Sequence, residues 1–199
     1  MKFTETEIKG VWIISPIVHE DGRGFFLESF SAAEMEAHGL PSRFVQDNHA
    51  RSKAPGVLRG MHFQKPPKAQ SKLIRVVRGS VYDVVVDLRR ESGTYGKCLS
   101  LTLSEENREM LFIPKGFAHG YCTLSPDTEF LYKVDEFYSP AHDSGIRWDD
   151  PAFGIKWMRL LPAEKNPLSR QHRVRPWSRS WATSIMAKPL CSTRFVSPT

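Results

Sequence analysis

The sequence has little cysteine, and the cysteines it has are scattered. Three occur among 199 residues, and no two form a Cys-x-x-Cys pair. A disulfide framework or a zinc ribbon needs more cysteines at closer spacing. An apolar N-terminal segment is also missing, as is any run near the ~20 apolar residues of a membrane span. We therefore expect a cytoplasmic protein without a membrane partner.

Excess charge is missing from most of the chain. The formal net charge is +6, yet residues 163–199 alone hold seven Lys and Arg against one acid, while residues 1–162 hold 21 of each sign. A nucleic-acid-binding protein needs a basic face on its folded body, with aromatic platforms for the bases. The distribution argues against a nucleic-acid partner. It also predicts one domain over residues 1–162 and a basic, non-periodic tail over residues 163–199.

Helical patterns are scarce. One short helix is predicted over Ala32–His38, because Ser31-Ala32-Ala33-Glu34 forms a capping box and Gly39 can end the helix. No comparable pattern follows Phe44. Short apolar or alternating runs recur instead at residues 11–14, 25–30, 97–104, 110–114, 119–124 and 128–134, with a polar turn at 19–24. Many short strands with frequent turns indicate an all-β sandwich or barrel.

Residues 56–86 place basic side chains among apolar runs that predict strands. Strands form a rigid scaffold on which Arg59, His62 and Lys72 would be held in fixed directions. Taken singly, His62 would be an ordinary core histidine and the two basic residues solvated charges on a sheet. Tyr132 would be a packed strand residue. Only their joint occurrence within longer motifs favours a functional site.

Two short patterns resemble the cupin superfamily. Gly56 precedes His62 at the spacing of the first cupin motif, and Pro114–His119 matches the Pro-x-Gly-x-x-His of the second. A metal-binding cupin has His-x-His in its first motif, whereas Gln64 takes the second histidine's place here. Two histidines on separate strands are a poor ligand set for a metal. We expect no metal, with a metal-dependent cupin oxygenase as an alternative.

The resemblance extends to five separated motifs, which are Gln46–His49, Gly56–Gln64, Phe112–Gly120, Glu129–Lys133 and Gly145–Pro151. In this order they resemble the dTDP-4-dehydrorhamnose 3,5-epimerase family over residues 1–160. The resemblance implies an all-β fold, a cupin-type jelly roll with one short N-terminal helix. It also implies a homodimer and an isomerase that uses no metal or organic cofactor. The reaction it implies is epimerisation at C3 and C5 of dTDP-4-dehydro-6-deoxyglucose, which gives dTDP-4-dehydro-L-rhamnose.

The same resemblance implies three catalytic residues. His62 matches the family's base, and an imidazole that titrates near neutral pH suits that role. Tyr132 matches the acid, because a phenol carries one transferable proton. Lys72 would supply positive charge for the oxyanion that forms when a proton α to the ketone is removed.

Further positions match substrate-contacting residues of the family. The predicted set is Arg23, Glu28, Gln46, Asn48, Arg59, Lys72, His119, Tyr138, Asp143 and Lys165. The guanidinium groups of Arg23 and Arg59 fit diphosphate oxygens in pairs. Tyr138 and Phe26 would offer flat apolar surface to the base or the sugar.

One motif departs from the family pattern. The family commonly carries Ser-Glu-Lys-Asp near its C-terminus, where the Asp orients the catalytic histidine, and this chain has Ala-Glu-Lys-Asn at residues 163–166. Either Asn166 or another acid such as Asp83 would then orient His62. Two alternatives stay open. One is an epimerase of another deoxysugar pathway that acts at C3 or C5 alone, and the other is a non-catalytic sugar-nucleotide-binding cupin.

Overall fold

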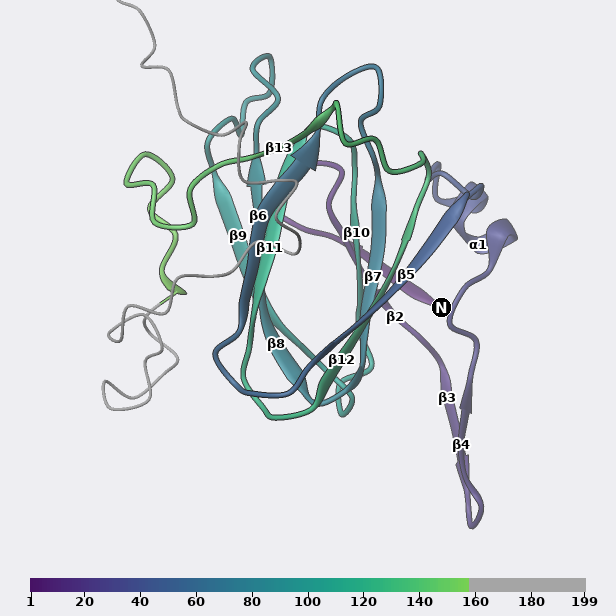
Figure 1. Ribbon diagram of the computed structural model, residues 1–199. Helices are drawn as coiled ribbons and strands as arrows, with labels where there is room; N and C mark the ends of the chain where they lie inside the picture. Colours follow the sequence, from purple (N-terminus) through teal and green to yellow (C-terminus); the bar gives the residue numbers. More distant parts are fainter. Residues whose placement is uncertain (158–199) are drawn as a thin grey trace, which may run out of the picture.

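The computed structural model describes residues 1–157, in which two large antiparallel sheets face each other and a third sheet is a two-stranded hairpin (Figure 1). The six-stranded sheet contains, in spatial order, β1 (Lys2–Glu5), β2 (Trp12–Ser15), β10 (Met110–Ile113), β7 (Lys72–Arg78), β12 (Thr128–Val134) and β5 (Gln46–Ser52). The five-stranded sheet contains β13 (Asp143–Gly145), β6 (Leu58–Gln64), β11 (Phe117–Thr123), β8 (Ser80–Asp87) and β9 (Cys98–Ser104). The predicted all-β jelly roll is confirmed. The predicted domain boundary and basic tail lie outside the described residues.

The main core lies between the two sheets. Ile74 and Val76 on β7 and Val81 and Val85 on β8 are almost fully buried, and they pack with Phe130 of β12. Alternate residues of a strand point to the same face, so one face of each sheet supplies this apolar layer. Removing such side chains from water is the main favourable term in folding.

The outer faces are covered by two separate segments. Helix α1 (Ala32–Ala37) lies over the six-stranded sheet, where Met35 packs on Ile14 and Phe112. Residues 146–157 lie over the five-stranded sheet, and the Trp157 indole nitrogen donates to the Trp148 carbonyl at 2.7 Å. Within residues 1–157, no helix is long and apolar enough to cross a membrane.

The predicted helix is confirmed to within one residue of its end. Ser31 is the N-cap, and its Oγ accepts a hydrogen bond from the Glu34 amide at 3.4 Å. Gly39 follows with φ of +68°, a conformation that suits glycine at a helix end. As predicted, residues 44–157 contain no further α-helix.

The polar segment 19–24 is mostly strand, so the predicted turn there was too wide. β3 (Val18–Asp21) and β4 (Gly24–Leu27) are joined by two residues only. The composition misled the prediction because this hairpin buries neither face, and exposed strands need no apolar alternation. We call residues 18–27 the arm.

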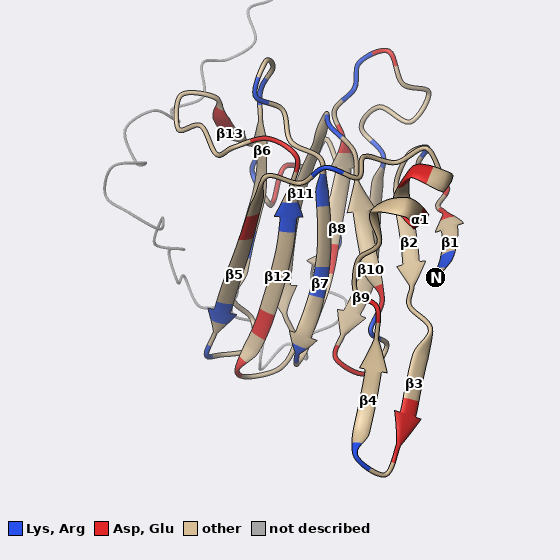
Figure 2. Cartoon of the chain, turned by 90° about the vertical axis from the view of Figure 1, so that its right-hand side faces the viewer, with Lys and Arg blue, Asp and Glu red and all other residues tan. Residues whose placement is uncertain are grey.

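The arm projects beyond the sandwich (Figures 1 and 2). Its Phe25 and Phe26 side chains are 56% and 72% exposed. Arg108, in the turn before β10, contacts it twice. The Arg108 guanidinium pairs with Glu20 at 2.5 Å and lies 4.1 Å from the centre of the Phe25 ring. The arm is therefore a single hairpin that Arg108 links to the sandwich.

Candidate active site

The interior at one end of the sandwich is polar. Tyr121 and Phe130 stack across it with ring centroids 4.1 Å apart, which identifies the inward face of β11 and of β12. His119 shares that face with Tyr121, and Tyr132 shares it with Phe130, because each pair is two residues apart. We call the polar groups gathered here the interior cluster; they are Arg59, His62, Lys72, Asp83, His119, Tyr121, Tyr132 and Asp143.

Strand β6 contributes two members of the cluster through a change of register. Arg59 and His62 are three residues apart, so a regular strand would point them to opposite faces. In the pairing of β6 with β11, however, His62 lies opposite His119 while Arg59 lies opposite Tyr121. Paired residues share a face, so both side chains point inward. The strand contains a β-bulge between them.

Glycines make this bulge sterically feasible. Gly60 has φ of +136°, and a Cβ at this position would lie 2.4 Å from the Cα of Gly120. A Cβ on Gly120 would in turn lie 2.9 Å from the Arg59 carbonyl oxygen. Any side chain at either position would push the two strands apart. The pair of glycines therefore sets the inward direction of both Arg59 and His62.

The His62 ring is neutral at physiological pH. Burial in the sandwich lowers its pKa to about 4, and the positive charge of Lys72, then His119 and Arg59, lowers it further. The ring keeps solvent-accessible surface. It makes no hydrogen bond within residues 1–157, and the predicted orienting residue Asn166 lies outside the described part. An unprotonated imidazole has a free lone pair, so His62 can accept a proton.

Lys72 is a cation that acts on His62, and its own pKa is strongly shifted. Burial lowers its pKa to about 8, while the carboxylates of Asp143 and Asp83 act in the opposite direction. The ammonium group is therefore largely charged at pH 7. A charge held in a region with little water acts strongly on any negative charge that forms beside it.

Two phenols complete the cluster. Burial raises the pKa of Tyr132, with Arg59 opposing the shift, so its hydroxyl keeps its proton at neutral pH. Burial also raises the pKa of Tyr121, which was not among the predicted residues. Its alternation with His119 on β11 was the sequence signal that marked it as inward-facing.

His119 is held by a carboxylate. Its Nε2 lies 2.9 Å from Oδ2 and 3.1 Å from Oδ1 of Asp83, and both side chains are buried. The Asp83 carboxylate was one of two candidates for orienting His62, and it binds the ring of His119 instead. The reason is the register, because β8 pairs with β11, on which His119 lies, and not with β6.

Three predicted polar residues lie along the inner edge of β5 and β6. Asn48 is directly opposite Tyr132 in the pairing of β5 with β12. Gln46 donates to the Asn48 side-chain oxygen at 2.9 Å. Arg59 donates through Nε to Ser52 Oγ at 3.3 Å, which ties its guanidinium to β5.

The structure does not bring every predicted residue to the cluster. Arg23 lies at the tip of the arm, where its side chain is 91% exposed and pairs with Asp21. Phe26 and Glu28 are also exposed, on or just after β4. Lys165 lies outside the described residues. In one protomer the arm points away from the interior cluster (Figure 1).

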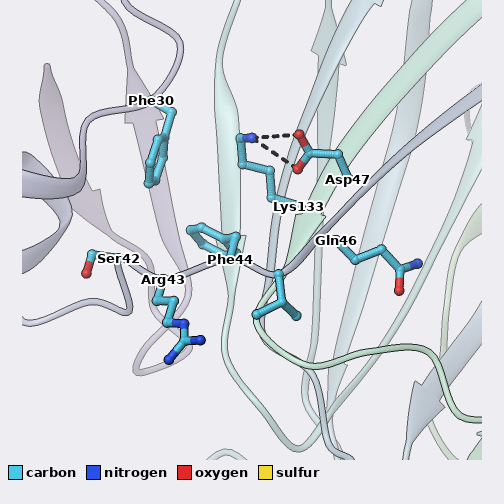
Figure 3. A pocket seen from close by; sticks show the side chains of 8 residues that line it. Phe30, Ser42, Arg43, Phe44, Gln46, Asp47 and Lys133 are labelled. Atoms are coloured by element: carbon cyan, nitrogen blue, oxygen red, sulfur yellow. Dashed lines mark hydrogen bonds and ion pairs between the residues drawn. The ribbon is translucent and has the colours of Figure 1, made fainter.

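An open hollow of about 630 Å³ lies on the outer side of β5 and β12. Figure 3 shows Lys133 beside Phe30 and paired with Asp47, whose carboxylate oxygens lie 2.9 and 3.0 Å from its Nζ. Both residues alternate with the inward-facing Asn48 and Tyr132, so they face away from the cluster. Gln46 borders this hollow as well.

Gln64, at the position of the second cupin metal ligand, forms hydrogen bonds with the main chain instead. Gln64 is 4% exposed, and its amide bonds to three main-chain groups. Residues 1–157 contain no group of three His, Cys, Asp or Glu side chains that could hold a metal ion. The donors present in the described part do not fit a metal site of the cupin type.

Comparison with known proteins agrees with this arrangement of motifs and strands. The family model described as dTDP-4-dehydrorhamnose 3,5-epimerase matches residues 5–176. The chain belongs to this family. A curated dTDP-4-dehydrorhamnose 3,5-epimerase of Methanothermobacter thermautotrophicus is 51% identical over 156 residues, which are 78% of this chain and 83% of the relative.

Solved structures of the family superpose on the same sandwich. The dTDP-4-dehydrorhamnose 3,5-epimerase of Bacillus anthracis, with TDP and pyrophosphate bound, has a TM-score of 0.77 at 48% identity and covers 79% of this chain and 90% of its own. The Legionella pneumophila epimerase in complex with dTDP-4-keto-L-rhamnose has a TM-score of 0.75 at 41% identity, with coverage of 84% and 90%. The predicted family membership is confirmed, and the chain is an epimerase of the dTDP-rhamnose pathway.

Proposed function

We propose that the interior cluster inverts C3 and C5 of dTDP-4-dehydro-6-deoxyglucose by removing and returning protons α to the C4 ketone. The product is dTDP-4-dehydro-L-rhamnose. One observation supports this assignment above the others: His62 and Tyr132 lie on opposite sheets and both point inward. Inversion requires a proton to leave from one face of the sugar and return on the other. A base and an acid on facing sheets meet that requirement.

His62 is the base in this proposal. Its neutral ring accepts the proton from C3 or C5, because burial and the nearby cations keep its pKa at about 4. After each inversion the imidazolium gives its proton to solvent, which the accessible surface of the ring allows, and the Tyr132 phenolate regains a proton from solvent. Asn166 remains a predicted orienter of this ring.

Lys72 stabilises the enolate. Removal of an α-proton moves negative charge onto the ketone oxygen, and a fixed cation in a poorly solvated place lowers the energy of that state. Asp143 and Asp83 keep the ammonium charged against the effect of burial. We assign Lys72 to the ketone oxygen because it is a half-buried ammonium on the inward face of β7, within the interior cluster.

Tyr132 returns the proton. Its raised pKa keeps it protonated until the enolate has formed. Phenolate formation is then favoured by the neighbouring Arg59, whose charge lowers the pKa of Tyr132. A hydroxyl that is protonated at rest and next to a cation fits a general acid.

The nucleotide part of the substrate would lie along β5 and β6. Arg59 would pair with the diphosphate, while Gln46, Asn48, His119 and Asp143 would contact polar groups of the sugar and nucleoside. Tyr138, which is 37% exposed, would stack on the base. No metal or organic cofactor has a place in this scheme.

A homodimer would bring the arm to a site. The arm carries Arg23, Phe26 and Glu28 away from the cluster of its own protomer, and its exposed phenylalanines favour a protein partner. On the outer face of β7, burial lowers the pKa of Arg75, which has no ion-pair partner within residues 1–157. Both features support a second copy as the missing cover. We propose that the partner's arm completes the diphosphate subsite.

Incubation in D₂O with dTDP-4-dehydro-6-deoxyglucose, followed by NMR of the sugar, tests the function. Deuterium at both C3 and C5 with inversion at both is the expected result. Inversion at a single carbon would identify an epimerase of another deoxysugar pathway. No exchange at either carbon would identify a non-catalytic binding protein. Activity that is lost with a chelator and restored by iron would favour the cupin oxygenase.

A further inference from the structure

The segment between β12 and β13 is fixed by a buried glutamine. Gln64 is 4% exposed and lies at the end of β6, two residues after His62. Its Nε2 donates to the Phe137 carbonyl at 3.2 Å and to the Lys68 carbonyl at 2.6 Å. Its Oε1 accepts a hydrogen bond from the Ser139 amide at 2.6 Å. Both amide hydrogens and the oxygen are therefore used.

A second glutamine binds the residue between these contacts. Gln46, at the start of β5, accepts a hydrogen bond from the Tyr138 amide through Oε1 at 3.1 Å. Its Nε2 is bound to Asn48. Side chains from two opposite sheets thus hold three consecutive main-chain groups, which are the Phe137 carbonyl, the Tyr138 amide and the Ser139 amide.

The side chains in this segment are much more exposed than its main chain. Phe137 is 60% and Tyr138 37% exposed, although their flanking peptide groups are bound to protein. Hydrogen bonds within a poorly hydrated region are costly to break, since each freed partner loses its only acceptor or donor. The arrangement fixes the main chain on both sides of the Tyr138 Cα, and with it the point from which the side chain extends.

Only an amide can make all the Gln64 contacts. Two carbonyl oxygens require two N–H donors, and one main-chain amide requires an acceptor. A carboxylate offers no donor, and an imidazole cannot face two carbonyls and one amide from a single edge. The residue at the second cupin ligand position has therefore been adapted to hold main chain.

We propose that Gln64 is a positioning residue for Tyr138, holding its ring where the nucleoside base stacks. This rests on the proposed function in one respect, the placement of the base on Tyr138. Gln64 acts on substrate affinity through the loop and has no part in proton transfer. Gln46 supports the same main chain from the other sheet.

The variant Gln64→Glu tests the proposal with dTDP as the probe, by calorimetric titration at several pH values. At pH 8 the carboxylate faces two carbonyls, and dTDP affinity should fall about tenfold relative to the wild type at that pH. The pKa of the new carboxyl is raised by burial and by those carbonyls. As pH falls and the carboxyl is protonated, it regains one donor, so the affinity ratio should return toward one. A ratio that does not change with pH would overturn the proposal.

A double-mutant cycle separates positioning from a general loss of structure. In the Tyr138→Ala background, Gln64→Glu should leave dTDP affinity unchanged, because there is no ring left to position. An equal loss in both backgrounds would contradict the proposal. The matched control is Gln70→Glu, since Gln70 donates to the neighbouring Glu136 carbonyl at 2.7 Å but to neither side of Tyr138. A tenfold loss with this control would also count against Gln64.

Gln64→Met keeps the proposal testable if Gln64→Glu does not fold. Methionine is of similar length and brings no buried charge, but it makes none of the three main-chain hydrogen bonds of Gln64. We expect about a threefold loss of dTDP affinity that disappears in the Tyr138→Ala background. The epimerase assay distinguishes the two proposals. Loss of dTDP affinity with unchanged D₂O exchange at saturating substrate supports Gln64 as a positioning residue. A wild-type protein without exchange would instead refute the proposed function.

Discussion

The interior cluster and the arm hold different parts of the predicted site in different ways. His62, Lys72 and Tyr132 lie on β6, β7 and β12, and each of these strands is paired on both sides. The arm pairs only with itself and contacts the sandwich through Arg108. Proton transfer requires groups held to a fraction of an ångström, whereas contacts to a diphosphate tolerate more freedom. The difference supports the proposal that the strands of one protomer hold the catalytic residues and that the arm of a partner adds a contact to the diphosphate.

Replacing His62 should have the largest effect. His62→Ala should lower deuterium exchange at both C3 and C5 by about 10²–10⁴-fold while dTDP still binds, because a general base contributes to the rate and little to ground-state affinity. NMR in D₂O and calorimetry measure the two quantities. His49→Ala, on the outer side of β5, is the matched control and should keep its activity. Exchange near the wild-type rate in His62→Ala would exclude His62 as the base.

Tyr132→Phe should separate exchange from inversion. His62 still removes protons, but the acid on the facing sheet is missing, so the yield of inverted product should fall by about a hundredfold while exchange persists. The test compares deuterium incorporation with the NMR coupling pattern of the product. Tyr121→Phe removes the other phenol of the cluster and should affect inversion less. Normal inversion in Tyr132→Phe would show that another group is the acid.

Mixing two impaired variants should reveal whether the arm acts on the partner's site. Arg23→Ala alone should lose about tenfold in kcat/KM, because a diphosphate contact is missing. Mixed and refolded with His62→Ala, it should recover to roughly a quarter of wild-type activity, since half of the dimers then have one intact site. Without such recovery, the arm would have to serve its own protomer or no site at all.

The lowered pKa of Lys72 predicts the pH above which activity should decline. Its charged form is required and its pKa is lowered to about 8, so kcat/KM should decline as pH rises through about 8. The acid limit should lie well below 6.5, because His62 becomes protonated only as pH falls toward about 4. Lys72→Arg keeps its charge and should lose the decline near pH 8 at a moderate cost in rate. If the pH profile of Lys72→Arg still declines near pH 8, the titration of another group causes the decline.

The smallest effect is expected at Asn166. Among residues 1–157 no carboxylate is hydrogen-bonded to His62, and an amide cannot stabilise an imidazolium by charge. Asn166→Asp should raise turnover a few-fold, with the greater gain toward neutral pH. Steady-state rates across the pH range measure the change. No gain would mean that the orienting group lies elsewhere.

Much of the fold was predictable, since it rests on local signals. The capping box fixed the start of α1, and short alternating runs marked strands such as β9, β11 and β12. The resemblance to known epimerase motifs led to the predictions of a jelly roll and of the family, and both predictions are confirmed. The width of the arm's turn was not predictable from composition, because polar residues are equally at home in an exposed hairpin. The roles of individual site residues, the homodimer and the cytoplasmic location stay predictions.

The geometry of the site depended on register, which sequence alone does not give. Asp83 was a candidate acid for orienting His62, but strand pairing placed it on His119. Gln64 signalled only a missing metal ligand, and two of its three main-chain contacts, to Phe137 and Ser139, come from a segment distant in the chain. Tyr121 could have been found by its alternation with His119. For Asp83 the deciding fact is which strands are neighbours, and for Gln64 it is which connecting segments lie beside the end of β6.

The bulge at Gly60 determines the direction of interior-cluster side chains but contributes little to the apolar layer between the sheets. It shifts the alternation of β6 by one residue, so each side chain after Gly60 points to the face opposite to the one that a regular strand would give it. A side chain at this position would place its Cβ 2.4 Å from the Cα of Gly120, so the bulge that turns both Arg59 and His62 inward could not form in its present shape. The apolar layer between the sheets draws mainly on other strands, so the sandwich would keep most of its core. One glycine therefore sets the direction of two side chains of the interior cluster, while most of the apolar layer is built by other strands.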